Sequence, residues 1–239
     1  MTEFKYIKSI ELKSLLKHLK SIDRGLNLKI IKPKIKWPNI QNHQSIEVIN
    51  IIREHHLLSQ NSFGSDIGFN KILERSINAD LWIHILDNKN KIIGLSINKK
   101  LFLNKQFVNE FCMTILNKHY KKLGIYPLLN ELRIKFFPCD YLLVRTQNPF
   151  VYKYFSKLCL DNSYKVSPTI NKINSNIIEL IKELYPKVDS NSIQRSGFDN
   201  ELLKNTPKPP IEIKPIWDRM DISNGDLVII VGYKNTLIT

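Results

Sequence analysis

The stretch FVNEFCMTILNKHYKKLGIYPLLNELRIKFFPCDYLLVRTQ, residues 107–147, decides the fold. Residues 107–116 favour a strand, and DYLLVRTQ (140–147) favours a short buried strand. Between them, apolar residues recur at helical spacing: Ile125, Leu128, Leu129, Leu132 and Phe136. A strand, a helix and a strand in this order predict a crossover between parallel strands, and therefore an α/β fold.

The residues before this stretch favour helices. Residues 9–24 and 67–77 have the apolar spacing of helices, and residues 28–36 favour a strand that Pro33 confines to an edge or a bend. Ser45 is the expected N-cap of another helix. The apolar positions of that helix are Ile46, Ile49, Ile52 and Leu57.

Strand signals dominate from residue 80. DLWIHILD (80–87) and KIIGLSINKKLFL (91–103) flank a turn cluster and predict a hairpin. The elements expected after residue 147 are helices at 148–158 and 171–185, a proline-rich loop at 207–215 and a last strand at 226–233.

These elements predict a mixed central sheet with helices on both faces. We divide the chain into an N-terminal helical segment (1–25), a core (26–160) and a C-terminal extension that completes the sheet (161–239).

The composition fits a globular protein of a reducing compartment. The chain has 239 residues, 43% of them hydrophobic and 24% charged, and can bury a sizeable core. Cys112, Cys139 and Cys159 form no Cys-x-x-Cys pair, which excludes a disulfide scaffold and a zinc ribbon of that type. No apolar run reaches the roughly 18–20 residues of a membrane helix, and no signal peptide is recognisable. We expect a cytoplasmic protein without a membrane span.

The net charge of +14 has two interpretations. It can mark a polyanionic partner such as nucleic acid, or it can reflect a bias toward lysine at solvated positions throughout the chain. The basic residues form no single block, and no zinc finger, RNA-binding aromatic motif or clear helix-turn-helix accompanies them. A nucleic-acid binder is an alternative that the sequence does not favour.

Residues 116–129, LNKHYKKLGIYPLL, place a basic loop directly before a helix. The first N–H groups of a helix have no partner within it and carry the positive end of the helix dipole. Gly124 lets a ligand approach the backbone because it has no Cβ, and Lys121 and Lys122 add positive charge. The segment predicts an anion site, although a glycine in this place also serves as an ordinary turn.

With its flanking hairpin and with RTQNPFVYKYFSKL (145–158), this loop resembles the phosphate loop of the GCN5-related N-acetyltransferase superfamily. The family pattern is Gln/Arg-x-x-Gly-x-Gly/Ala. Lys121 fills its first position, Gly124 is the central glycine, and Tyr126 replaces the last small residue. The resemblance spans roughly residues 80–160 and implies acetyl-CoA or another acyl-CoA as the co-substrate.

The resemblance also assigns the residues that bind this co-substrate. It implies that loop amides bind the pyrophosphate and that the backbone at the end of the preceding strand binds the acyl carbonyl. Asn148 matches the family's asparagine before the next helix. The loop and strand residues are Thr114, Ile115, Leu116, Lys121, Lys122, Leu123, Gly124, Ile125 and Tyr126.

Three residues are candidates for proton transfer. Glu110 precedes Lys121 by 11 positions, where some family members carry a general base; the alternative is a solvent-facing glutamate at a strand start. The family's tyrosine, often the general acid, is matched by Phe155, which cannot donate a proton. Tyr154 and Tyr152 are nearby candidates for that role, and each could instead serve packing or face solvent.

Polar residues at the end of the second strand are candidates for the acceptor site. Arg145 and Gln147 end that strand beside the expected cleft; the alternative is a satisfied polar strand end. His55, His56 and His84 lack companions at metal-ligand spacing, so we expect no metal.

The resulting prediction is an acyltransferase that moves an acetyl or other acyl group from acyl-CoA to an amine of a small molecule or protein. A catalytically degenerate acyl-CoA-binding or interaction module is the first alternative, because of the departures at Tyr126 and Phe155.

Overall fold

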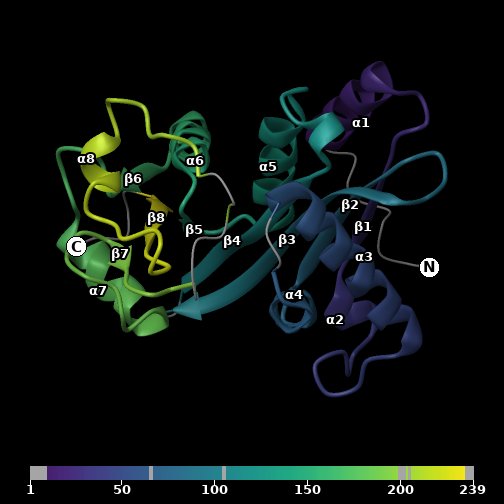
Figure 1. Ribbon diagram of the computed structural model, residues 1–239, viewed down its shortest axis with the longest axis horizontal. Helices are drawn as coiled ribbons and strands as arrows, with labels where there is room; N and C mark the ends of the chain where they lie inside the picture. Colours follow the sequence, from purple (N-terminus) through teal and green to yellow (C-terminus); the bar gives the residue numbers. More distant parts are fainter. Residues whose placement is uncertain (1–9, 65–66, 104–105, 199–202, 204–205, 235–239) are drawn as a thin grey trace. The chain divides into compact units, whose positions relative to one another are not determined.

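The computed structural model describes residues 10–64, 67–103, 106–198, 203 and 206–234 (Figure 1). The chain divides into two compact units. Unit 1 comprises Met1–Lys99 and Cys112–Pro138, and unit 2 comprises Lys100–Phe111 and Cys139–Thr239. Strands β3 (Ile92–Leu103) and β4 (Gln106–Leu116) contribute residues to both units, so the boundary falls within strands.

The strands of unit 1 form an antiparallel arrangement with two covered faces. β1 (Asn27–Ile31) pairs with β2 (Leu81–Leu86), and β2 pairs with β3. Side chains alternate along β2, so its odd-numbered and even-numbered residues face opposite sides. All six are buried or nearly so, which explains why the segment is apolar except for His84.

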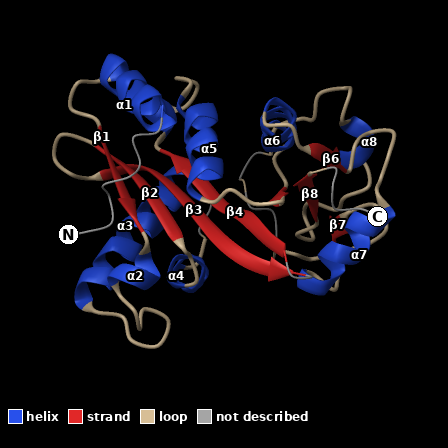
Figure 2. Ribbon diagram, turned by 180° about the vertical axis from the view of Figure 1, so that it is seen from behind, coloured by secondary structure: helices blue, strands red, loops and turns tan. Residues whose placement is uncertain are grey.

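Helices cover both faces of these strands. α1 (Ile10–Ile22) and α5 (Ile125–Phe136) lie side by side (Figure 2), and both contribute leucines to one core cluster with the odd-numbered residues of β2. On the other face, α3 (Ile46–Phe63) and α4 (Phe69–Ile77) meet the even-numbered residues, where Trp82 Nε1 donates to the Ser76 carbonyl at 3.0 Å.

Unit 2 contains the parallel strand pair. β4 and β5 (Tyr141–Thr146) are parallel, with Val108–Glu110 in register with Tyr141–Leu143. β8 (Leu227–Tyr233) runs antiparallel to β5 along all six residues of β5. β6 (Lys165–Ser167) and β7 (Ile193–Gln194) also pair with β8.

Two longer helices cover opposite faces of β8. α7 (Ser175–Leu184) packs its isoleucines against the odd-numbered residues of β8. α6 (Pro149–Asp161) lies against the even-numbered side, where a Cβ on Gly232 would come within 2.5 Å of Cys159 Sγ. This close approach requires glycine in the strand.

The mixed sheet with helices on both faces, predicted from the sequence, is confirmed. The predicted hairpin, the crossover and the last strand are all present. Ser45 caps α3 as expected, because its hydroxyl accepts from the Val48 N–H at 3.3 Å. The division into segments 1–25, 26–160 and 161–239 stays a prediction.

Three local predictions are wrong. The strand expected at 28–36 ends at Ile31, and Pro33 starts the short helix α2 (Pro33–Lys36), because its fixed φ suits a first helical position. The proline-rich loop at 207–215 runs into another short helix, α8 (Lys214–Trp217).

The third error concerns the buried face of α3. Ile46 and Leu57 are 82% and 57% exposed, whereas Val48 and Ile52 are buried. The apolar spacing of this helix fits two overlapping faces, and only packing against β2 decides between them.

Candidate active site

The predicted phosphate loop follows β4 in unit 1. A short 3-10 helix, Lys118–Tyr120, comes first, and the Asn117 side chain caps it. Gly124 is the N-cap of α5 with φ 73°, in the left-handed region that glycine adopts without steric cost. Lys122 also has a positive φ, 64°. Two left-handed residues within three positions give the tight turn from which α5 starts.

The start of α5 has the properties of an anion site. Gly124 supplies no side-chain cap. The structure describes every residue of the first turn, and none of them is acidic. No carboxylate of that turn therefore competes with an external anion for the positive end of the helix. Lys122 is exposed beside this turn. The uncapped helix start and the exposed lysine suit a phosphate group, with the His18 imidazole beside Gly124.

The aromatic ring at the last position of the loop is accommodated by the core. Tyr126 packs against the apolar cluster of α1, α5 and β2, which includes Leu15, Leu19 and Leu129. Ile125 is buried in the same cluster. The Tyr126 side chain, which is larger than the Gly or Ala of the family pattern, therefore packs against the core.

The end of α3 ties the loop to β4. Lys121 Nζ donates to the Ser62 carbonyl at 2.8 Å, and the Ser62 hydroxyl donates to the Leu116 carbonyl at 3.0 Å. Burial lowers the pKa of Lys121. The ammonium of Lys121 thus holds the loop in place, a role that no sequence pattern indicated.

A buried arginine supports β4 where the acyl carbonyl is expected. Arg133 of α5 donates to the Thr114 hydroxyl, to Asn98 Oδ1 at 2.7 Å and to the Ile97 carbonyl at 2.8 Å. Burial lowers the pKa of Arg133 to about 9, so the guanidinium stays charged at neutral pH. The sequence did not single out Arg133, although it lies four positions after Leu129 and therefore on the apolar face of α5. Ile115 and Leu116 are buried on the same strand.

The structure brings two predicted residues of unit 2 together. Arg145 Nε lies 3.3 Å from Glu110 Oε1, and the glutamate is only 5% exposed. The Tyr185 hydroxyl donates to the same oxygen at 2.7 Å. Glu110 is therefore not the solvent-facing residue of the alternative prediction. Arg145 pairs with the expected base, and its contact with the acceptor stays a prediction.

Asn148 and Gln147 have structural contacts. Asn148 caps α6, since its Oδ1 accepts from the Phe150 N–H at 3.0 Å. Gln147 is buried, and its amide donates to the Asp226 carbonyl at 3.0 Å. Trp217 Nε1 donates to the Gln147 carbonyl at 2.9 Å. These bonds hold Gln147 inside unit 2, and its substrate contact stays a prediction.

The tyrosines of α6 differ in exposure. Tyr152 is buried, and its hydroxyl donates to the Pro168 carbonyl at 2.8 Å. Burial also raises the pKa of Tyr152, and its acid role stays a prediction. Phe155 is buried edge-on against Phe111. Tyr154 is 50% exposed and stays the candidate acid.

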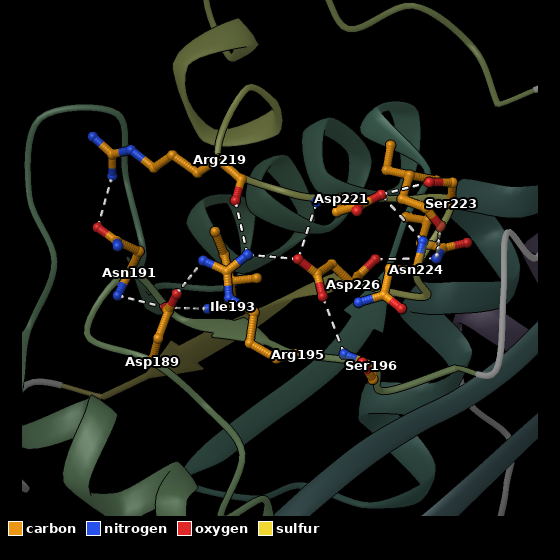
Figure 3. Close-up of polar contacts among 12 residues, drawn as sticks. Asp189, Asn191, Ile193, Arg195, Ser196, Arg219, Asp221, Ser223, Asn224 and Asp226 are labelled. Carbon is orange, nitrogen blue, oxygen red and sulfur yellow. Dashed lines mark hydrogen bonds and ion pairs between the residues drawn. The ribbon is translucent and has the colours of Figure 1, made fainter.

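A second polar cluster in unit 2 organises loops (Figure 3). Asp226 is 2% exposed and accepts from Arg195 and from the N–H groups of Ser196 and Asp221, both at 3.0 Å. Arg195 also pairs with Asp189 at 2.7 Å. The loops before and after β7 are thus joined to the start of β8.

The histidines of unit 1 include a buried pair. His55 Nε2 lies 2.9 Å from His84 Nε2, and His55 Nδ1 lies 3.1 Å from the Ser76 hydroxyl. The sequence did not predict this pair. His56 points elsewhere, to the Ile67 carbonyl. Within the described part of the chain, no group of three or more His, Cys, Asp and Glu residues is arranged to hold a metal ion.

None of the helices in the described ranges combines the length and apolar character that crossing a membrane requires.

No family model matches the sequence, and no curated protein matches it. Solved structures of acetyltransferases do match. The ribosomal-protein alanine N-acetyltransferase from Escherichia coli is 9% identical, with a TM-score of 0.47 over 89% of this chain and 100% of that chain. The IAA acetyltransferase from Bacillus cereus is 13% identical, with a TM-score of 0.43 over 86% and 97%.

A structure of the NatC complex bound to Gag peptide and CoA is 16% identical, with a TM-score of 0.38 over 59% of this chain and 84% of that chain. At these identities, residue roles do not transfer from those proteins to this chain.

Proposed function

We propose that the protein transfers an acyl group from acetyl-CoA or another acyl-CoA to an amine of a small molecule or protein. The observation that carries the proposal is the start of α5: a left-handed glycine, no side-chain cap, no acidic residue in the described first turn and an exposed lysine. This is the chemistry that binds a pyrophosphate.

The reaction joins the amine nitrogen to the acyl carbon and breaks the carbon–sulfur bond of the thioester. Glu110 takes the proton that the attacking amine loses, directly or through a water molecule. The departing thiolate takes up a proton, for which Tyr154 is the candidate donor. The loop at Lys121–Tyr126 binds the pyrophosphate, and the backbone of Thr114–Leu116 binds the acyl carbonyl region.

A binding module without catalysis is the second candidate function. It is favoured by Phe155 and Tyr152, since the first is buried without a hydroxyl and the second donates its hydroxyl to Pro168. Tight acyl-CoA binding without thiol release across a panel of amines would identify such a module.

Reversing one charge in the loop tests the proposal. Lys122→Glu places a carboxylate beside the expected phosphates, and we expect acetyl-CoA to bind about tenfold more weakly because like charges repel. Isothermal titration measures the affinity. Gly124→Glu is less clean, because a side chain at φ 73° adds strain of about 1–2 kcal/mol.

Lys89→Glu is the matched control, since Lys89 is an exposed lysine in the turn between β2 and β3. It makes the same change in net charge and should leave the affinity unaltered. If both variants bind like the parent protein, the loop is not the phosphate site; if the parent binds no acyl-CoA, the proposed function is wrong.

A further inference from the structure

The C-terminal extension brings a tyrosine to the candidate base. Tyr185 is the C-cap of α7, and its hydroxyl donates to Glu110 Oε1 at 2.7 Å. Its ring also lies under the Arg145 guanidinium, 4.6 Å from the ring centroid. Glu110 on β4, Arg145 on β5 and Tyr185 after α7 therefore form one cluster from three elements of unit 2.

The hydroxyl of Tyr185 is held in place by the core. Ile177, Ile178 and Ile181 of α7 are each 3% exposed or less, and they pack with β8 and with Val108 of β4. The Tyr185 N–H donates to the Ile181 carbonyl at 2.8 Å, and its ring packs against the same cluster. The donor is therefore positioned before any substrate arrives, which lowers the cost of orienting the base.

A buried carboxylate needs such partners. Removing a carboxylate from water is costly unless hydrogen bonds or a counter-ion replace the water. A hydroxyl that donates to an ionised carboxylate makes a short and strong hydrogen bond, which agrees with the 2.7 Å distance at Glu110. The contact therefore fixes the orientation of the Glu110 carboxylate.

We propose that Tyr185 is a positioning residue, through which the C-terminal extension orients the Glu110 carboxylate for proton abstraction. This inference rests on the proposed acyl transfer. Tyr185 keeps its own proton throughout, while Glu110 accepts the proton of the amine. The extension at 161–239 is then a working part of the catalytic centre.

The test is Tyr185→Phe in the full-length protein, which removes the hydroxyl and keeps the ring under Arg145. We expect kcat to fall about tenfold with an unchanged KM for acyl-CoA. The pH–rate profile should also change, because the carboxylate loses a hydrogen-bond donor. A packing role would change neither the pH–rate profile nor kcat relative to KM.

Tyr233→Phe is the matched control. Tyr233 lies in the same core cluster, and its hydroxyl accepts from Asn174 Nδ2 at 3.2 Å, away from Glu110. Both variants lose one hydroxyl from this core, so a general loss of stability would affect both. Only Tyr185→Phe should alter the pH–rate profile.

A measurement without turnover separates the two proposals. Carbon-13 labelling of glutamate side chains follows the titration of Glu110, whose signal is assigned by its loss in Glu110→Gln. If that titration stays unchanged in Tyr185→Phe, the positioning role is wrong even in an active enzyme. If it changes but no acyl-CoA and amine react, the proposed acyl transfer is wrong, and so is the proposed base role of Glu110.

Discussion

Glu110 and Asp226 are buried carboxylates of unit 2, and each has an arginine partner. Their other partners differ. Asp226 accepts from two backbone N–H groups, at Ser196 and Asp221, whereas Glu110 accepts from a tyrosine hydroxyl. Backbone donors fix a carboxylate to the main chain, which is typical of a residue that holds a loop in place. A side-chain donor can orient a carboxylate that gains and loses a proton during a reaction.

The electrostatics of Asp226 agree with a structural role. Burial alone would raise the pKa of Asp226, but the backbone N–H groups of Asp221 and Ser196 and the Arg195 guanidinium outweigh it, and the pKa is lowered. The carboxylate is therefore stabilised in its ionised form. The comparison predicts that Asp226 contributes mainly to stability and Glu110 mainly to turnover.

The largest expected effect is on folding. Asp226→Asn should lower the free energy of unfolding by about 3 kcal/mol, because Arg195 and the two N–H groups lose a buried charged acceptor. Urea unfolding followed by circular dichroism measures the change. Asp218→Asn removes an exposed ion pair with Lys214 and should cost at most about 0.5 kcal/mol.

The same variant has a pH signature. The lowered pKa means that Asp226 contributes stability above its ordinary pKa of about 3.8, and that this contribution is lost as the pH falls through the folded-state value. The difference between the parent protein and Asp226→Asn should therefore shrink below about pH 4. A constant difference across the acid range would contradict the assignment.

Glu110→Gln should lower turnover more than it lowers stability. Its kcat should fall about 100-fold, equivalent to about 2.7 kcal/mol, because an amide cannot accept the proton of the amine. Stability should fall by only about 1 kcal/mol, since glutamine keeps an oxygen that can accept from Tyr185 and Arg145 keeps its contact with the Tyr185 ring. The measurements are steady-state kinetics and urea unfolding on one preparation. A stability loss as large as that of Asp226→Asn, with full activity per folded molecule, would make both carboxylates structural.

The buried histidines of unit 1 extend the comparison to groups that fold uncharged. Burial lowers the pKa of His84 to about 3, with Lys29 adding to the effect, and burial followed by the neighbouring His84 lowers that of His55. The unfolded chain binds protons near pH 6.5 and the folded chain does not, so stability should fall as the pH drops below that value. We expect a loss of about 2 kcal/mol for each of the two histidines between pH 7.5 and 5.

Urea unfolding at the two pH values measures this loss. His84→Gln should flatten the pH dependence, because it removes one proton-binding group. His43→Gln, at an exposed histidine, should leave the dependence unchanged. Equal slopes for all three proteins would exclude the buried pair as its source.

Local patterns predicted the elements whose signals are confined to neighbouring residues. Ser45 precedes an apolar helix and caps it, and Gly124 adopts the left-handed conformation at the start of α5. Pro33 shows the limit of such patterns. Proline suits either a strand edge or a helix start, and the apolar residues around Pro33 favoured the strand.

The polar residues of the site were harder to predict because their roles depend on distant partners. Gln147 and Arg145 end the same strand, yet one is held by Asp226 and Trp217, and the other pairs with Glu110. Tyr152 differs from Tyr154 only by its place on the face of α6. The spacing of these residues does not show which of them contact the substrate and which contact the core.

The sequence by itself determined the succession of strands and helices, the crossover at 107–147 and the basic loop before a helix, because each depends on short-range periodicity and backbone preferences. Only the tertiary structure decided that Tyr185, 75 residues from Glu110, donates to its carboxylate, and that Tyr126 packs into the core. Such contacts form when apolar faces from separate parts of the chain pack together, and a one-dimensional pattern does not specify which side chains then meet.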